Sequence, residues 1–240
     1  MKNSLFSELM KTTIPVLDDN ENIISYAFIF EFIVPEDNSK VIPFLILNYL
    51  DIQGKTTAKL EFTISENSIK DKFYVAFDAE FIANMRLNDY VVYPIANLIN
   101  ECRNSGKVLD YVGINEKWII DLENPKTRSI ETLSYINYGK FDFSDEYIPY
   151  VQRTYNCIPF YNEKYNYYMI DAMNSTSLGY PVLLVEEGSF YNGDGLCLGT
   201  RIVFVGIASR YVNEKVLVQY PNYLVQEIKK KYKKMFEKYE

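Results

Sequence analysis

The chain contains no histidine among its 240 residues. Histidine is the usual general acid or base near neutral pH and the commonest metal ligand. Its absence excludes Ser-His-Asp and Cys-His nucleophilic catalysis, together with zinc sites and nucleases that depend on a histidine. Catalysis by paired carboxylates is still open, as are Mg²⁺ or Ca²⁺ sites built from Asp and Glu.

Cysteine and long apolar runs are also scarce. The three cysteines are widely spaced and form no C-x-x-C motif: Cys102, Cys157 and Cys197. This pattern predicts buried thiols in a reducing compartment. The longest apolar stretch, Ile23–Val34, is interrupted by polar residues and is shorter than the roughly 20 residues that a bilayer requires. We therefore expect a cytoplasmic protein without a membrane span, and we expect no secretory signal.

Four of the ten glycines lie in one segment, EEGSFYNGDGLCLGT, over residues 186–200. A dinucleotide-binding or phosphate-binding loop requires a helix after its glycines. Here the next residues, TRIVFVGIAS, have the alternation of a strand, and the lysine of a P-loop is missing. Asn-Gly and Asp-Gly pairs are typical of tight turns. The segment predicts a hairpin between strands 181–187 and 201–206, with a ligand loop or a calcium site at Asp194 as alternatives.

The formal charge of −7 is unevenly distributed. Residues 227–240 contain six lysines and three glutamates, a net charge of +3, so the other 226 residues carry −10. An acidic body repels nucleic acid and anionic membranes and favours a basic partner. We interpret the lysine-rich end as the solvated face of a docked helix, with nucleic-acid or membrane-surface binding as the alternative.

The hydrophobic pattern predicts an α+β fold of mostly antiparallel sheet, with a mid-chain helix and a C-terminal amphipathic helix. A meander is expected from four strands, over residues 22–35, 41–50, 58–65 and 72–77. Later strands are expected over residues 117–122, 165–173, 181–187, 198–209 and 215–220. The helices are expected over residues 93–106, with Pro94 in the first turn, and 221–240, and Asp78 is expected to cap a shorter helix.

The domain organisation is expected to be simple. Residues 1–240 have the composition and length of a single domain. The irregular acidic segment 139–150 is a candidate seam between subdomains 1–138 and 139–240. Residues 129–138 fit a helix or a strand equally well.

A tyrosine-rich segment spans residues 147–171. Its seven tyrosines are Tyr147, Tyr150, Tyr155, Tyr161, Tyr165, Tyr167 and Tyr168. Tyrosine provides a large contact area at low entropy cost and is enriched at protein interfaces. Half-buried sheet residues and a small-ligand or sugar site are the alternatives. The candidate interface residues are Tyr161, Tyr165, Tyr167, Tyr168, Asp171 and Asp194.

No catalytic signature, cofactor motif or metal motif accompanies these features. We therefore predict a non-enzymatic protein-binding module, such as an inhibitor, an immunity protein or a phage counter-defence protein that acts on a basic surface of its partner. One alternative is a carboxylate-dependent or Mg-dependent enzyme acting on a sugar or nucleotide, for which Asp171 and Asp194 are the residues to test. Another is a structural or assembly protein.

Overall fold

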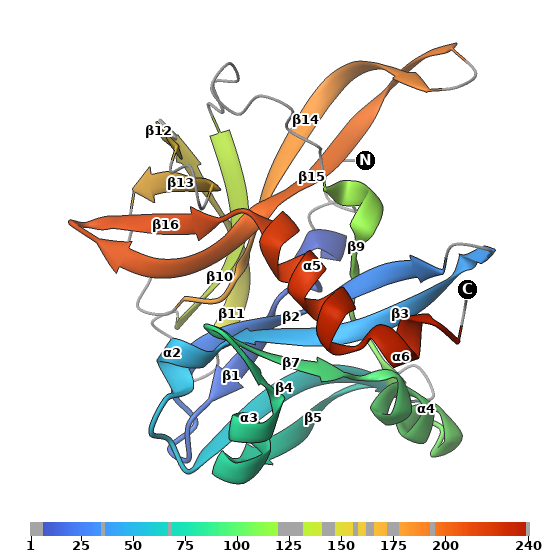
Figure 1. Cartoon of the computed structure of the whole chain (residues 1–240), viewed down its shortest axis with the longest axis vertical. Helices are drawn as coiled ribbons and strands as arrows, with labels where there is room; N and C mark the ends of the chain where they lie inside the picture. Colours follow the sequence, from blue (N-terminus) through green and yellow to red (C-terminus); the bar gives the residue numbers. More distant parts are fainter. Residues whose placement is uncertain are drawn as a thin grey trace.

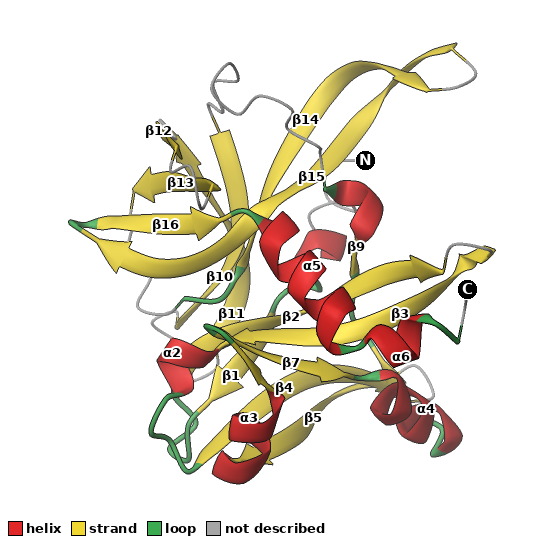
Figure 2. Ribbon diagram, in the orientation of Figure 1, coloured by secondary structure: helices red, strands yellow, loops and turns green. Residues whose placement is uncertain are grey.

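The computed structural model describes residues 7–34, 37–66, 69–119, 132–140, 147–155, 158–161, 166–171, 178–192 and 195–238. In these residues the chain folds into two sheets and several short helices (Figures 1 and 2). Nearly all strand pairs are antiparallel, and a helix follows the last strand. The predicted α+β fold is confirmed.

The first sheet, sheet A, contains nine strands within the described residues. They are β1 (Ile14–Leu17), β2 (Ile23–Val34), β3 (Asp37–Asn48), β4 (Thr57–Glu66), β5 (Ile69–Asp78), β6 (Arg86–Leu87), β7 (Tyr90–Pro94), β8 (Val108–Leu109) and β9 (Ile114–Asn115). The strand order is β5-β4-β1-β2-β3-β7-β6, while β8 pairs with β4 and β9 runs parallel to β2.

The second sheet, sheet B, contains seven strands within the described residues. They are β10 (Thr132–Lys140), β11 (Tyr147–Tyr155), β12 (Ile158–Tyr161), β13 (Asn166–Asp171), β14 (Pro181–Asn192), β15 (Gly195–Val212) and β16 (Lys215–Gln219). The strand order is β11-β10-β14-β15-β16-β13-β12. The far end of the β14–β15 hairpin projects from the rest of the molecule (Figure 1).

The helices connect and cover these sheets. They are α2 (Tyr49–Ile52), α3 (Ala79–Met85), α4 (Ala96–Asn104), the 3₁₀ helix η1 (Glu116–Trp118), α5 (Pro221–Lys231) and α6 (Lys233–Phe236). None of the helices in the described ranges combines the length and apolar composition that a membrane crossing requires.

The predicted meander is wrong, because a short strand separates its members. β1 lies between β2 and β4, and β3 pairs with β7 instead of β4. β1 is only four residues long and all four are buried, so it has no alternating pattern to reveal it. β2 itself forms as predicted, but it is buried on both faces because it lies inside the sheet.

The helix predictions are largely confirmed. Asp78 caps α3 by accepting a hydrogen bond from the backbone N–H of Phe81 at 2.7 Å. Gly106, with a φ of 80°, follows α4 where a positive φ is needed to end a helix. Pro94 is not in the first turn of α4, because it is the last residue of β7. Pro221 is at the start of α5, as predicted, but the single helix expected over 221–240 is interrupted at Tyr232, which separates α5 from α6.

Other predictions in the middle of the chain need correction. The expected strand at 117–122 is replaced over its first residues by η1, and residues 120–122 lie outside the described residues. The expected strand end at residues 49 and 50 is instead the start of α2, where Asn48 caps the helix by accepting from the N–H of Leu50. The ambiguous segment 129–138 is β10 from Thr132 onwards. Residues 138 and 139 are consecutive in that strand, and the division into subdomains stays a prediction.

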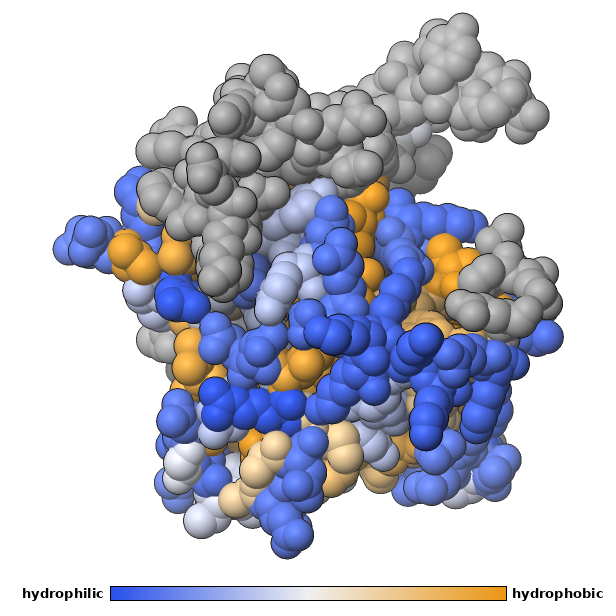
Figure 3. Space-filling model, in the orientation of Figure 1, coloured by the Kyte–Doolittle hydropathy of each residue, from blue (hydrophilic) through white to orange (hydrophobic). Residues whose placement is uncertain are grey.

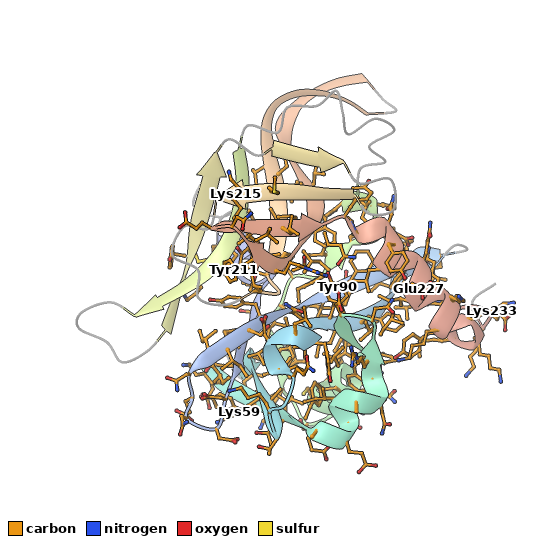
Figure 4. The ribbon with its side chains drawn as sticks, turned by 60° about the vertical axis from the view of Figure 1, so that its left-hand side comes forward. Lys59, Tyr90, Tyr211, Lys215, Glu227 and Lys233 are labelled. Carbon is orange, nitrogen blue, oxygen red and sulfur yellow. The ribbon has the colours of Figure 1, made fainter. Side chains whose placement is uncertain are left out.

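One hydrophobic cluster is shared by both sheets. Its buried members come from sheet A, sheet B and α5: Leu9, Phe28, Phe30, Phe32, Val34, Ile42, Phe44, Ile46, Tyr90, Val92, Ile114, Ile136, Leu183, Phe204, Ile207, Leu224 and Ile228. α5 runs across the middle of the molecule between the sheets, with its apolar side on this cluster (Figure 1). Tyr90 lies at the same junction (Figure 4) and donates its hydroxyl hydrogen to the side chain of Gln219. The opposite face of sheet A packs against α3 and α4 in a second cluster.

Candidate protein-binding site

The predicted interface residues fall mainly on the β12–β13 hairpin. Tyr161 is the last residue of β12, and Tyr167 and Tyr168 lie in β13. β12 is an edge strand of sheet B, and β13 lies next to it. Tyr165 and Asp194 lie outside the described residues. The sequence predicted the strand that became β13, which carries Tyr167 and Tyr168, but it did not predict β12.

Sheet B brings the rest of the tyrosine-rich segment to the same region. Tyr147, Tyr150 and Tyr155 lie on β11, which is at the opposite end of the strand order from β12. β11 nevertheless contacts β13, so the sheet is curled and its two ends lie close to each other. Strands that carry six of the seven tyrosines are thereby brought together. We call β11, β12 and β13 the tyrosine strands.

The strand register places Asp171 beside β16. It is the last residue of β13 and is aligned with Lys215 of β16 in antiparallel register. Lys215 lies at the start of β16, near the end of the β15–β16 hairpin (Figure 4).

The glycine-rich segment lies in a hairpin, as predicted. β14 and β15 pair continuously up to Asn192 and Gly195, and the two residues between them lie outside the described residues. Gly188 is aligned with Gly199 within the strands, so these two glycines are not in the turn. β15 follows the turn directly, and a helix N-terminus that would bind a phosphate does not follow these glycines.

The lysine-rich end of the chain is a docked helix. Leu224 and Ile228 of α5 are buried in the shared cluster. On the other side, Lys229 contacts the carboxylate of Glu116, and Nζ of Lys231 donates to the backbone oxygen of Arg86 at 3.0 Å. Lys233 lies beyond the end of α5, at the outside of the molecule (Figure 4). The docked-helix interpretation is confirmed.

A second surface was not foreseen from the sequence. Large hydrophobic side chains are exposed on the elements around the β6–β7 turn: Leu50 (41%), Tyr211 (42%), Val212 (38%) and Tyr223 (43%). They come from α2, the β15–β16 hairpin and α5. On the face shown in Figure 3, separate orange areas lie among blue hydrophilic side chains. We call this group the junction surface. No short sequence pattern reveals it, because its members are far apart along the chain.

Polar contacts hold the junction surface together. Arg210 forms an ion pair with Asp89 at 3.1 Å, and the backbone oxygen of Asp89 accepts from the N–H of Tyr49 at 2.8 Å. Asn88 donates to the hydroxyl of Tyr223 at 3.4 Å. These contacts connect the β6–β7 turn to α2, β15 and α5. Tyrosine and arginine beside exposed apolar groups are typical of protein interfaces.

A half-buried carboxyl group lies where the two sheets meet, next to this surface. Oδ2 of Asp51 accepts hydrogen bonds from Oγ of Ser25 at 2.9 Å and from Nδ2 of Asn48 at 3.1 Å. Asn48 also donates to the backbone oxygen of Ser209 in sheet B at 3.2 Å. Burial raises the pKa of Asp51 to about 6, although hydrogen bonds from Ser25, Asn48 and the backbone of Leu178 oppose that shift.

The pKa of the Asp51 carboxyl lies in the range that acid–base catalysis uses. Its neighbours are hydroxyl, amide and backbone groups, and no second carboxylate contributes to its shift among the described residues. In the described part of the chain, no group of three or more Cys, Asp or Glu side chains is arranged to hold a metal ion.

Comparison with protein families finds no family model that matches the chain, and comparison with curated proteins finds no matching sequence.

Proposed function

We propose that this chain is a non-enzymatic protein-binding module that acts on a basic surface of its partner, as an inhibitor, immunity protein or phage counter-defence protein would. The observation that supports this proposal is the curling of sheet B, which brings β11 into contact with β13. Positions for six tyrosines are thereby gathered from both ends of one sheet. Tyrosine is one of the residues that contribute most to binding energy at interfaces.

The negative net charge of residues 1–226 supports a basic partner. Residues 1–226 carry a net charge of −10, and the lysines of α5 and α6 do not cancel it. Opposite charge on a partner accelerates association, and like charge on competing surfaces suppresses wrong complexes. The tyrosine strands would supply the affinity, and the acidic body would supply the association rate and part of the specificity.

The test is a crosslinking pull-down with the whole chain as bait, at low and high salt, read by mass spectrometry. We expect one basic protein whose capture weakens as salt rises. Tyr167 and Tyr168 are consecutive in β13, and consecutive strand residues belong to opposite faces of a sheet. At least one of the variants Tyr167→Ala and Tyr168→Ala should therefore reduce its capture at least about tenfold, because tyrosine hot spots contribute about 2 kcal/mol or more. Tyr74→Ala is the matched control, since Tyr74 is 39% exposed on β5 of the other sheet.

Two results would contradict the proposal. One is the absence of any specific partner at either salt concentration. The other is capture that the Tyr74 variant reduces as strongly as the Tyr167 and Tyr168 variants do. If Tyr211→Ala alone abolishes capture, the protein binds its partner through the junction surface, and the tyrosine strands are structural.

A further inference from the structure

Glu31 is a half-buried carboxylate in the middle of a hydrophobic strand. It lies on β2, and the preceding residues on the same face, Ala27 and Ile29, belong to the cluster between sheet A and α4. Glu31 is the next residue on this face, and it lies beyond the cluster. Opposite it on β3, Pro43 faces Glu31 and Val41 faces Ile33, and Val41 is 37% exposed. The carboxylate is therefore bordered by apolar residues at a point where the sheet face meets solvent.

Two residues from the segment before β9 border the Glu31 side chain. Gly113 lies so close that a Cβ atom at that position would overlap the Glu31 carboxyl group, so the missing side chain makes room for it. Tyr111 is half-buried against the same cluster; burial, with a smaller contribution from the charge of Glu31, raises the pKa of its hydroxyl to about 12. The site thus combines the Glu31 carboxylate, the Tyr111 ring and the backbone of Gly113, which has no side chain.

Glu31 differs from the other glutamates of this region in its partners. Glu116 accepts from Lys229 and from the N–H of Ile33, and Glu61 contacts Lys72 and Tyr74. Within the described ranges, no side chain or backbone group donates a hydrogen bond to Glu31. Burial accordingly raises the pKa of its carboxyl, and among the described residues no charged neighbour lowers it. A partly desolvated carboxylate without a donor is costly for the free protein.

We propose that Glu31, Tyr111 and Gly113 form a docking site for a basic side chain, an arginine or a lysine, of a partner protein. A guanidinium or ammonium group supplies the hydrogen bonds that the carboxylate lacks, and such charge-assisted bonds are the strong ones. The Tyr111 ring adds an aromatic surface that attracts a cation. A divalent metal ion is a poorer occupant, because one carboxylate is too few ligands for it.

The site is independent of the tyrosine strands. Glu31, Tyr111 and Gly113 belong to sheet A or to the segment that leads into β9, whereas β11, β12 and β13 belong to sheet B. The docking site therefore has its own test, and neither result depends on the other.

The experiment titrates the whole protein with an acetylated, amidated hexaarginine peptide at low salt and follows binding by calorimetry. The side-chain carboxyl carbon of Glu31 is followed by NMR in the same titration. We expect Glu31→Gln to weaken peptide binding about tenfold, because a hydrogen bond to a charged group is lost. Glu101→Gln is the matched control: it removes the same charge from an exposed position on α4 and should change binding about twofold or less.

The folded state of the variant is checked by denaturation. Because burial raises the pKa of Glu31, its ionised form destabilises the fold at pH 7, so Glu31→Gln should be at least as stable as the natural chain. A variant that is more stable but binds less well would show a binding role, since a purely structural role would not separate these two properties. Gly113→Ala is a second test of the site. Its methyl group displaces the Glu31 carboxylate and should weaken binding of the same peptide.

The proposal is overturned if Glu31→Gln and Glu101→Gln weaken binding equally, because the peptide then senses only net charge. It is also overturned if the Glu31 carboxyl resonance is unchanged at saturating peptide. Loss of peptide binding in the Tyr167 variant with no loss in the Glu31 variant would likewise refute this site, while leaving the proposed function intact.

Discussion

Ser25 donates its hydroxyl hydrogen to Asp51 at 2.9 Å, and this contact lies where the two sheets meet. Ser25 is on β2 and lies close to the backbone oxygen of Leu178. Asp51 is in α2, and its neighbour Asn48 donates a hydrogen bond to the backbone of Ser209 in sheet B. The carboxyl group is thus both a structural connection and a titratable group. Its protonation state changes the stability of the junction.

The first prediction concerns pH. The pKa of Asp51 is raised to about 6 in the folded protein from an ordinary value of 3.8. The folded state therefore binds the Asp51 proton more tightly than the unfolded state does. The stabilisation of the folded protein by this proton is fully present below pH 3.8 and is lost as pH rises through 6. Between pH 4.5 and 7.5 this amounts to about 2 kcal/mol of unfolding free energy.

Asp51→Asn tests that dependence. An amide oxygen can replace Oδ2 and keep the bonds from Ser25 and Asn48. Relative to the natural chain, the variant should gain stability as pH rises from 4.5 to 7.5 in urea denaturation. A constant difference between the two proteins over this range would show that Asp51 does not titrate as described.

The second prediction concerns a glycine at the same junction. Gly179 has a φ of 91°, and a Cβ atom there would overlap the carbonyl oxygen of Tyr26. Gly179→Ala should lower the unfolding free energy by more than about 2 kcal/mol, because backbone strain and overlap add together. Gly54 has a φ of 78° but open space around it, so Gly54→Ala should cost only about 1 kcal/mol. Equal losses in denaturant titrations would contradict the close approach.

The third prediction concerns the docking of α5. Ile228 is fully buried in the cluster that both sheets share. Ile228→Ala should reduce the unfolding free energy by roughly 2–5 kcal/mol, since it leaves a cavity. Lys230→Ala, on the exposed side of the same helix, is the control and should change stability by no more than about 0.5 kcal/mol. Thermal or chemical denaturation distinguishes the two variants.

The fourth prediction concerns Cys102. The thiol is buried on the core side of α4, and burial raises its pKa. Only the thiolate reacts with alkylating reagents, so Cys102 should be modified slowly in the native protein at pH 7.5 and rapidly in denaturant. Peptide mapping after iodoacetamide treatment measures this directly. Fast native labelling at Cys102 would mean that α4 does not shield it.

Local patterns predicted much of this fold. α5 has apolar residues at helical spacing after Pro221, and the β14–β15 hairpin has turn residues between two strand-forming runs. Both elements depend on neighbours in sequence, so the sequence reveals them. β1 and β9 are only four and two residues long, and they are held by pairing with longer strands: β1 with β2 and β4, and β9 with β2. Such short strands have no periodic signal of their own.

The binding surfaces were predictable only in part. The tyrosine-rich segment is visible in the sequence, but the contact between β11 and β13 depends on how the whole of sheet B curls. The junction surface combines α2, the β6–β7 turn, β15 and α5. Glu31 is visible as an acidic residue within an apolar strand, but its closeness to Gly113 is a property of the folded chain.

The shared cluster has a consequence for how the protein folds. Leu9 and Ile228 belong to it together, although nearly the whole chain lies between them. Contacts this distant require the closure of very long loops, and proteins dominated by them fold slowly. The apolar face of sheet A therefore stays exposed to solvent until sheet B and α5 pack against it. During that interval the nascent chain is most exposed to aggregation, and a chaperone would protect it most effectively.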